Sequence, residues 1–277
     1  MNEIGRLPCA WGRYDDVAEP YERFQASNGY AALAADLVAA LHLTPGASLL
    51  VVGCGTGAVT VTAQKAVGAR GLVVGLDISV AMLRRAFAGS VAHPVAGIVP
   101  GLPFHDRCFD AVAASLVLSH VERCEAALRD MVRVLKPGGR LGVSAGAKSP
   151  NRPNVAYRAW EETAESFVGT EALGETITRV VPCEGWLTDP AHIETALASV
   201  GLEGIEVHQR EYRVTMPTDD YLSMLDLFAY GRFLCWRLGP EQWQTFRESV
   251  AAKVAAHGLK QIEYTSRYHV GVGARQR

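Results

Sequence analysis

The sequence lacks the features that mark several common classes of protein. No apolar run reaches about 18 residues without a charge, which argues against a membrane-spanning helix. The opening stretch, MNEIGRLPCAWGRYDD, carries acids and no apolar core, so we expect no signal peptide. The 27 basic and 29 acidic residues form no Lys/Arg run, so the charge pattern gives no support for a nucleic-acid partner.

Cysteine is sparse and scattered. The six cysteines are Cys9, Cys54, Cys108, Cys124, Cys183 and Cys235. They form no C-x-x-C pair, and no neighbouring histidine completes a zinc-binding spacing. We therefore expect reduced thiols, a cytoplasmic location and no metal site.

Apolar residues are abundant enough for one large folded domain. The 277 residues are 49% hydrophobic and 20% charged, a balance that excludes a disordered chain. We predict a single domain over 1–277 that acts as a monomer or a homodimer. Its core is expected at 45–149, 189–216 and 258–277, and its cap segments at 1–30, 150–188 and 217–257.

Strand-like and helix-like segments alternate along the first half of the chain. Apolar runs bounded by turn residues predict strands at 48–53, 71–77, 94–99, 109–118 and 140–146. Helical patterns fall at 15–42, 57–67, from Ser79 onward, and at 122–135. Further strands are expected at 203–214 and 261–275. This alternation predicts an α/β fold with a doubly wound parallel sheet and helices on both faces.

A glycine-rich turn lies where the first strand meets its helix. Gly53, Gly55 and Gly57 lack Cβ atoms, so the backbone there can turn with positive φ and approach a ligand closely. Asp77, at the end of the second strand, can accept hydrogen bonds from both hydroxyls of a ribose. The same spacing also fits the G-x-G-x-x-A dinucleotide fingerprint, so this motif alone leaves a nicotinamide cofactor open.

Five stretches in a fixed order narrow the choice: LLVVGCGTG (49–57), GLDIS (75–79), GLPFHDRCFD (101–110), SLVLSHV (115–121) and VLKPGGRL (134–141). With these stretches the sequence resembles the class I S-adenosylmethionine-dependent methyltransferases. It is most similar to the subfamily that includes ubiquinone/menaquinone and natural-product methyltransferases. The resemblance implies a mostly parallel, seven-stranded Rossmann-like sheet with one antiparallel strand at the end.

The resemblance also implies a function. It predicts transfer of a methyl group from S-adenosylmethionine to O, N or C of a small, partly apolar acceptor, with S-adenosylhomocysteine as product. Three alternatives stay open: a non-methylating S-adenosylmethionine enzyme such as a cyclase, a nicotinamide-dependent oxidoreductase, and a binding module without catalysis.

Site residues follow from the positions that match the family. The residues expected along the methionine and ribose are Gly53, Cys54, Gly55, Gly57 and Asp77. Those expected at the adenine are Ile78 and Met82, and those expected under the sulfonium are Ser115 and Leu116. Tyr14 and Tyr21 lie in a segment that resembles the family's lid, although ordinary helix packing explains them equally well.

The sequence departs from the family pattern at Ile98, where relatives often carry an aspartate that accepts from the adenine amino group. That charge-assisted hydrogen bond is absent here, which leaves packing and the backbone of Val99 to read the base. His120 is expected to face the methyl group or the acceptor and is the best candidate for a general base. The alternative is that His120 caps the following helix or orders the cofactor loop.

Aromatic residues gather in the two later cap segments. They either form an apolar acceptor pocket or, more commonly at helical spacing, pack as core. The residues concerned are Trp160, Trp186, Tyr221, Phe228, Phe233 and Trp236. Three arginines of these segments, Arg158, Arg232 and Arg237, are weak candidates to bind an acidic group on the acceptor.

Overall fold

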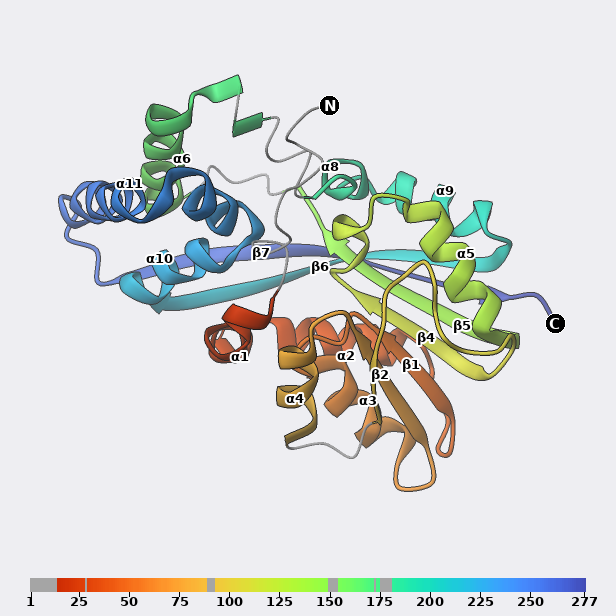
Figure 1. The fold of residues 1–277 in the computed structure, drawn as a ribbon. Coiled ribbons are helices and arrows are strands. Elements are labelled where there is room, and N and C mark those ends of the chain that lie inside the picture. The colour runs from red at the N-terminus through yellow and green to blue at the C-terminus, as the bar shows by residue number, and fades with distance from the viewer. Residues whose placement is uncertain (1–13, 28, 89–92, 149–153, 172, 175–180) are drawn as a thin grey trace, which may run out of the picture.

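The computed structural model describes residues 14–27, 29–88, 93–148, 154–171, 173–174 and 181–277. In these ranges the chain forms a seven-stranded sheet in the order β3-β2-β1-β4-β5-β7-β6 (Figure 1). The strands are β1 (Ser48–Val52), β2 (Leu72–Asp77), β3 (His93–Ala96), β4 (Phe109–Ser115), β5 (Leu135–Gly146), β6 (Leu202–Pro217) and β7 (Gln261–Arg275). β7 runs antiparallel to both of its neighbours, and β1 to β5 pair in parallel. The predicted fold class is confirmed.

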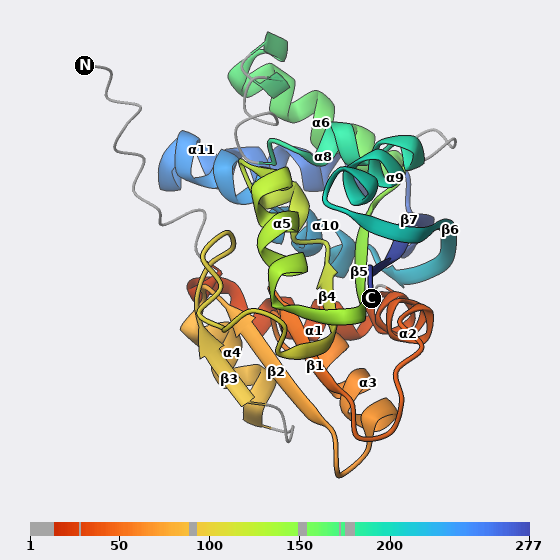
Figure 2. The same ribbon diagram turned by 90° about the vertical axis from the view of Figure 1, so that its right-hand side faces the viewer.

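Helices cover the sheet on both faces. One layer is α2 (Tyr30–Ala40), α3 (Ala58–Val67) and α4 (Val80–Ala88), and the other is α5 (Cys124–Val134), α8 (Glu184–Leu187) and α9 (Pro190–Ser199) (Figures 1 and 2). Side chains alternate along each strand. Leu49 and Val51 of β1 therefore pack with α2 and α3, while Leu50 and Val52 pack with α5 and α9. Burial on both faces explains why the strands appear in the sequence as continuous apolar runs.

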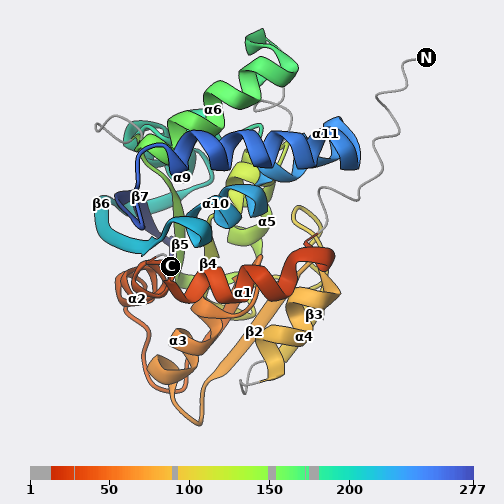
Figure 3. The ribbon, with the colours of Figure 1, turned by 90° about the vertical axis from the view of Figure 1, so that its left-hand side faces the viewer.

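A third apolar cluster lies beyond the sheet. β7 pairs with β5 only over its second half, from Tyr268 to Ala274, whereas its first half pairs with β6 alone. This two-stranded extension carries α10 (Thr218–Leu227) and α11 (Ala229–Ala255), against which α6 (Val155–Val168) packs (Figure 3). α1 (Ala18–Ser27) contacts both α10 and α4 and so lies between this cap and the sheet domain.

One predicted helix is divided in two, and another ends one residue early. The helix expected over 15–42 is a short 3-10 turn (Asp15–Val17) followed by α1 and α2, because Gly29 adopts φ 86° in front of α2. A Cβ on Gly29 would lie 3.1 Å from the Cβ of Tyr212, so the break also lets α2 approach β6. The helix expected over 122–135 ends at Val134, since Leu135 already pairs with Phe109 as the start of β5.

The prediction that a helix starts at Ser79 holds. The Ser79 hydroxyl accepts from the Met82 amide at 3.1 Å, so Ser79 does cap α4. Asp110 accepts hydrogen bonds from the Ser48 amide and from Lys136. These bonds connect the starts of β1, β4 and β5, at the end of the sheet away from the cavity. None of the helices in the described part of the chain combines the length and apolar character that a membrane crossing requires. Cys9 and the first part of the predicted cap segment 1–30 lie outside the described residues, and the division into core and cap segments stays a prediction.

Candidate active site

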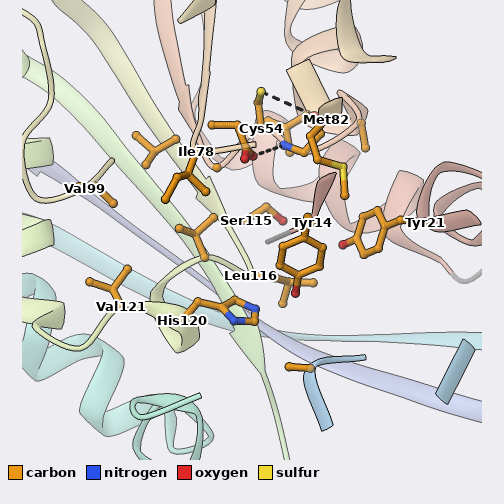
Figure 4. A pocket seen from close by; sticks show the side chains of 18 of the residues that line it. Tyr14, Tyr21, Cys54, Ile78, Met82, Val99, Ser115, Leu116, His120 and Val121 are labelled. Carbon is orange, nitrogen blue, oxygen red and sulfur yellow. Dashed lines mark hydrogen bonds between the residues drawn. The ribbon is translucent and has the colours of Figure 1, made fainter. Parts of the chain in front are cut away.

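A cavity of about 520 Å³ opens at the carboxyl ends of β1, β2 and β4. The strand order reverses between β1 and β4, and in open α/β sheets ligands bind at such a switch point. The volume is in the range of pockets that hold small molecules. Figure 4 shows its labelled side chains, which come from the segment before α1, from α1 and α4, from the segments that follow β1, β2 and β3, and from the end of β4 and the turn after it.

The glycine-rich turn forms one wall of this cavity. Gly53 (φ 60°) and Gly55 (φ 54°) line it, and both occupy the left-handed region that disfavours residues with a Cβ. A Cβ on Gly53 would lie 2.3 Å from Cγ2 of Val117, so no side chain fits there. Gly57 (φ 102°) lies further back as the N-cap of α3 and is not among the lining residues.

Asp77 holds the glycine turn in place. One carboxylate oxygen accepts from the Gly55 amide at 2.8 Å, and the other accepts from the Ser79 amide at 2.9 Å. Burial raises the pKa of Asp77, and the hydrogen bonds from these two amides oppose that shift. Cys54 lies beside it in the cavity wall, where burial raises the pKa of the thiol and keeps it protonated. The carboxylate therefore faces the cavity from a fixed position.

Two isoleucines expose apolar surface next to Asp77. Ile78 is 65% exposed and Ile98 is 55% exposed, although both belong to the cavity lining. Large apolar side chains left open inside a cavity are typical of a ligand-binding surface. Met82, which is buried, and Val99 also line the cavity. The structure thus brings together the residues predicted to contact an adenine.

The end of β4 supplies the floor of the cavity. The Ser115 hydroxyl lies 2.9 Å from the hydroxyl of Ser144 on β5, which fixes its position. Leu116 has φ 58°, a conformation that is costly for a branched residue. Its amide donates to the Ser144 carbonyl at 3.0 Å, and this bond secures the strained turn. Such strain is concentrated at functional sites.

His120 and two tyrosines stand opposite the glycine turn. The Tyr14 ring lies between Tyr21 and His120, with ring centroids 5.7 Å and 6.0 Å away (Figure 4). His120 is open to the cavity but is surrounded by protein atoms, and this desolvation, with a smaller contribution from Arg232, lowers its pKa to about 4. Burial raises the pKa of both tyrosines. At neutral pH the three side chains are therefore uncharged.

Several lining residues were not predicted from the sequence. They come from α1, α2, the segment before α8 and the first turn of α11, and include Gln25, Tyr30, Pro182 and Ala229. Arg232 was considered only as one of three arginines, and it is the one of them that lines the cavity. None of the six cap aromatics singled out above lines it. Trp160 and Tyr221 are instead buried in the cap cluster.

Potential metal ligands are dispersed among the residues that the structure describes. The described residues contain no group of three or more His, Cys, Asp or Glu side chains arranged to hold an ion. The five described cysteines are free thiols.

The fold and the position of the cavity define a class: a Rossmann-like α/β fold of the methyltransferase type. Residues 50–143 match the family model described as "Methyltransferase domain". The resemblance to methyltransferases that was read from the sequence is confirmed over this segment. The matched segment includes the glycine turn, Asp77, Ile98 and His120.

Curated relatives match over part of their length. The chain is 34% identical over 138 residues to the demethylmenaquinone methyltransferase of Symbiobacterium thermophilum, covering 46% of this chain and 55% of that protein. It is 33% identical over 169 residues to the ubiquinone/menaquinone biosynthesis C-methyltransferase UbiE of Azotobacter vinelandii, covering 56% and 65%. The chain thus spans about half to two thirds of the length of the curated relatives it matches.

Solved structures show the same fold over nearly the whole chain. Phosphoethanolamine N-methyltransferase 2 of Haemonchus contortus, in complex with S-adenosyl-L-methionine, aligns with a TM-score of 0.58 at 14% identity and covers 95% of this chain and 57% of that one. A SAM-dependent methyltransferase of Thermotoga maritima aligns with a TM-score of 0.54 at 18% identity, covering 96% and 99%. At these identities the similarity concerns the fold.

Proposed function

We propose that this protein is an S-adenosylmethionine-dependent methyltransferase that acts on O, N or C of a small, partly apolar metabolite. The observation that carries the proposal is the pairing of Asp77 with the Gly55 amide at the mouth of the cavity. The pocket therefore contains a carboxylate, a glycine backbone and the exposed side chains of Ile78 and Ile98. That set suits a ligand with a ribose hydroxyl pair and a flat apolar base.

The residues present fit this cofactor in type. Asp77 would accept from the ribose hydroxyls, and Ile78 with Met82 would pack on the adenine. Ile98 offers apolar surface but no acceptor, so Val99 would read the base through its backbone. Those proposed along the methionine and the sulfonium are Gly53, Cys54, Gly55, Gly57, Ser115, Leu116 and Tyr21. When bound, S-adenosylmethionine supplies a methyl group on a positively charged sulfur, which is already an activated leaving group.

The protein's own task is then to hold the acceptor in line and to exclude water. Tyr14 and Tyr21 cover the cavity from the N-terminal side, consistent with a lid. His120 faces the space in front of the floor residues and is neutral at neutral pH. It can accept a hydrogen bond from the acceptor there, and a role as general base stays a proposal.

The acceptor need not be a quinone. The relatives named above are called methyltransferases of demethylmenaquinone and of ubiquinone/menaquinone biosynthesis, but the matched methyltransferase domain covers only 50–143. Tyr14, Ala229 and Arg232, which line the other side of the cavity, lie outside that segment. We therefore propose only a small, partly apolar acceptor. A monomeric or homodimeric state, a cytoplasmic location and the absence of a nucleic-acid partner remain predictions.

Calorimetric titration of the purified protein with S-adenosylhomocysteine tests the cofactor assignment. We expect saturable one-site binding and a rise in the melting temperature, because a ligand that binds only the folded state stabilises it by mass action. NAD, titrated in parallel, should have no effect. Stabilisation by NAD and not by S-adenosylhomocysteine would overturn the proposal in favour of an oxidoreductase.

A second candidate is a non-methylating reaction, such as a cyclisation, that uses the same cofactor site. Ile98 leaves this reaction open, because the side chain that usually accepts a hydrogen bond from the adenine is missing at that position. Mass spectrometry of the product separates the two, since methyl transfer adds one carbon to the acceptor and cyclisation adds none. Cofactor binding without turnover of any acceptor would instead indicate a binding module.

A further inference from the structure

The first turn of α4, all of whose residues the structure describes, has no acidic side chain of its own. Helix N-termini leave backbone N–H groups without partners and favour a negative charge nearby. An aspartate from outside the helix meets this need. One oxygen of Asp15, in the 3-10 turn before α1, accepts from the Ala81 amide at 3.0 Å and from the Ser79 hydroxyl at 3.0 Å. Asp15 therefore caps α4 from a position 64 residues before Ser79 in the sequence.

Ser79 connects this cap to Asp77. Ser79 is 1% exposed, and its hydroxyl also accepts from the Met82 amide at 3.1 Å. The Ser79 amide donates to the Asp77 carboxylate at 2.9 Å. A serine hydroxyl has one proton to donate, and here Asp15 accepts it. The contacts thus run from Asp15 through Ser79 to the carboxylate that faces the cavity.

The neighbour of Asp15 in the chain, Tyr14, lines the cavity. The Tyr14 carbonyl accepts from the Val17 amide at 3.3 Å, within the turn that Asp15 begins. The Tyr14 ring contacts His120 edge-on (Figure 4), and the guanidinium carbon of Arg232 lies 4.3 Å from the ring centre. Because the two residues share a peptide bond, the cap on α4 determines where the Tyr14 backbone enters the cavity wall.

Two ion pairs also connect α1 to α4. Arg85 of α4 pairs with Glu19 at 3.2 Å and with Glu22 at 2.6 Å. All three side chains are about one-third exposed or more. Ion pairs this exposed contribute little to stability. The Asp15 cap differs from them because its partner Ser79 is buried.

We propose that Asp15 is a positioning residue of the cofactor site. Through Ser79 and the first turn of α4 it holds Asp77 and Ile78, which are proposed to contact the ribose and the adenine. It also places Tyr14 in the same cavity. Asp15 is not among the described residues that line the cavity, so it acts through these neighbours. The inference deepens the proposed methyl transfer and rests on its cofactor assignment.

A positioning contact of this kind has two measurable consequences. A site that is held in place before the ligand arrives binds more tightly than one that the ligand must order. Loss of a helix cap typically changes an equilibrium constant by about fivefold, so loss of Asp15 should weaken S-adenosylhomocysteine binding by about that factor. Coupling between two sites is reciprocal. S-adenosylhomocysteine should therefore stabilise the cap and slow hydrogen exchange in residues 14–25.

Calorimetric titration with S-adenosylhomocysteine compares Asp15→Ala, which removes the cap, with Asp15→Asn. Both hydrogen bonds end on the same oxygen of Asp15, so asparagine can keep both. We expect about fivefold weaker binding in Asp15→Ala and less than about a twofold change in Asp15→Asn. Rescue by asparagine would show that the acceptor oxygen carries the effect.

Asp189→Ala is the matched control. Asp189 caps α9 through the same kind of bond, accepting from the Ala191 amide at 2.9 Å, and it lies outside the described lining of the cavity. The control should lose a helix cap and keep the wild-type affinity for S-adenosylhomocysteine. Circular dichroism verifies the fold of each variant.

Hydrogen exchange followed by mass spectrometry tests the reciprocal effect. In the wild-type protein, saturating S-adenosylhomocysteine should slow exchange in peptides that cover residues 14–25. In Asp15→Ala this protection should be reduced, while protection of the glycine turn at 53–57 should remain. The wild-type measurement needs no variant, so it decides the matter if Asp15→Ala does not fold.

Several outcomes would overturn this inference. They are an affinity of Asp15→Ala within about twofold of the wild type, equal losses in Asp15→Ala and Asp189→Ala, and exchange of residues 14–25 in the wild type that does not respond to the ligand. Binding as weak in Asp15→Asn as in Asp15→Ala would also overturn it, because the acceptor oxygen would then not be the cause. Failure of the proposed function itself is seen separately, as a wild-type protein that does not bind S-adenosylhomocysteine.

Discussion

Replacing Asp77 with asparagine changes one charge in the wall of the cavity and leaves the shape of the side chain almost unaltered. The two carboxylate oxygens accept from the amides of Gly55 and Ser79. Asparagine has one acceptor oxygen and one NH2 group, so it can satisfy only one of these amides. The substitution therefore affects both the glycine turn and any ligand that donates to the carboxylate.

The expected magnitudes follow from this geometry. One backbone amide left without a partner should lower the free energy of unfolding by about 1–3 kcal/mol. The ribose would lose charge-assisted hydrogen bonds worth about 1.5–3 kcal/mol each. We therefore expect a loss of about 3 kcal/mol in binding, which corresponds to S-adenosylhomocysteine binding roughly 150-fold more weakly.

Calorimetric titration with S-adenosylhomocysteine measures this loss, and urea unfolding measures the change in stability. Asp110→Asn is the matched control. Asp110 also accepts from a backbone amide, that of Ser48, but at the opposite edge of the sheet, where it contacts Lys136. The control should lose stability and keep its ligand affinity. Unchanged affinity in Asp77→Asn, or an equal loss in both variants, would refute the assignment of Asp77 to the ribose.

Three further predictions concern single residues. Gly53→Ala should lower the free energy of unfolding in urea by about 3 kcal/mol or more, because the new Cβ would lie 2.3 Å from Val117. Gly55→Ala should lower it by only about 1–2 kcal/mol, the cost of a left-handed residue, because its Cβ meets no atom within 4 Å. Equal losses in the two variants would contradict this reasoning. Burial raises the pKa of Asp226 from 3.8 to about 6, so the folded state binds more protons than the unfolded state between these values. Asp226→Asn should therefore stabilise the protein by up to about 3 kcal/mol above pH 6, and this gain should disappear toward pH 4. Thermal melts of both proteins from pH 4 to pH 8 measure the difference, and no gain in stability at pH 8 would disprove the prediction. The imidazole NMR signal of His120, identified by its loss in His120→Gln, should titrate near pH 4, and titration near pH 6.5 would show that the ring is not desolvated.

The glycine-turn side of the cavity was predictable because its determinants are local. The turn residues Gly53 and Gly55 follow a buried apolar run, and Asp77 ends the next one. Strand ends of a parallel sheet meet at one edge, so these positions must converge whatever the rest of the chain does. The same holds for Ser79, whose capping role depends only on the residues that follow it.

The break at Gly29 could not be predicted from helix propensity, because the surrounding residues are strong helix formers. Its cause lies far away in sequence, where Tyr212 of β6 packs against the turn and leaves no room for a Cβ. Arg232 poses the same difficulty. Nothing near it in sequence distinguishes it from Arg237 of the same helix, and only the paired extension of β6 and β7 brings its helix to the cavity. Long-range packing of this kind leaves no local pattern.

The segment before α1 connects two sides of the cavity. Tyr14 lines the cavity and also lies beneath the Arg232 guanidinium. Phe24 of α1 packs edge-on against Phe228, directly before α11, with ring centroids 5.6 Å apart. Because close-packed aromatic contacts resist displacement, Tyr14, α1 and the helix that carries Arg232 should hold their positions together. Both segments lie outside the region of 50–143 that matches the methyltransferase model, so the cavity is completed by parts of the chain that flank this region on either side.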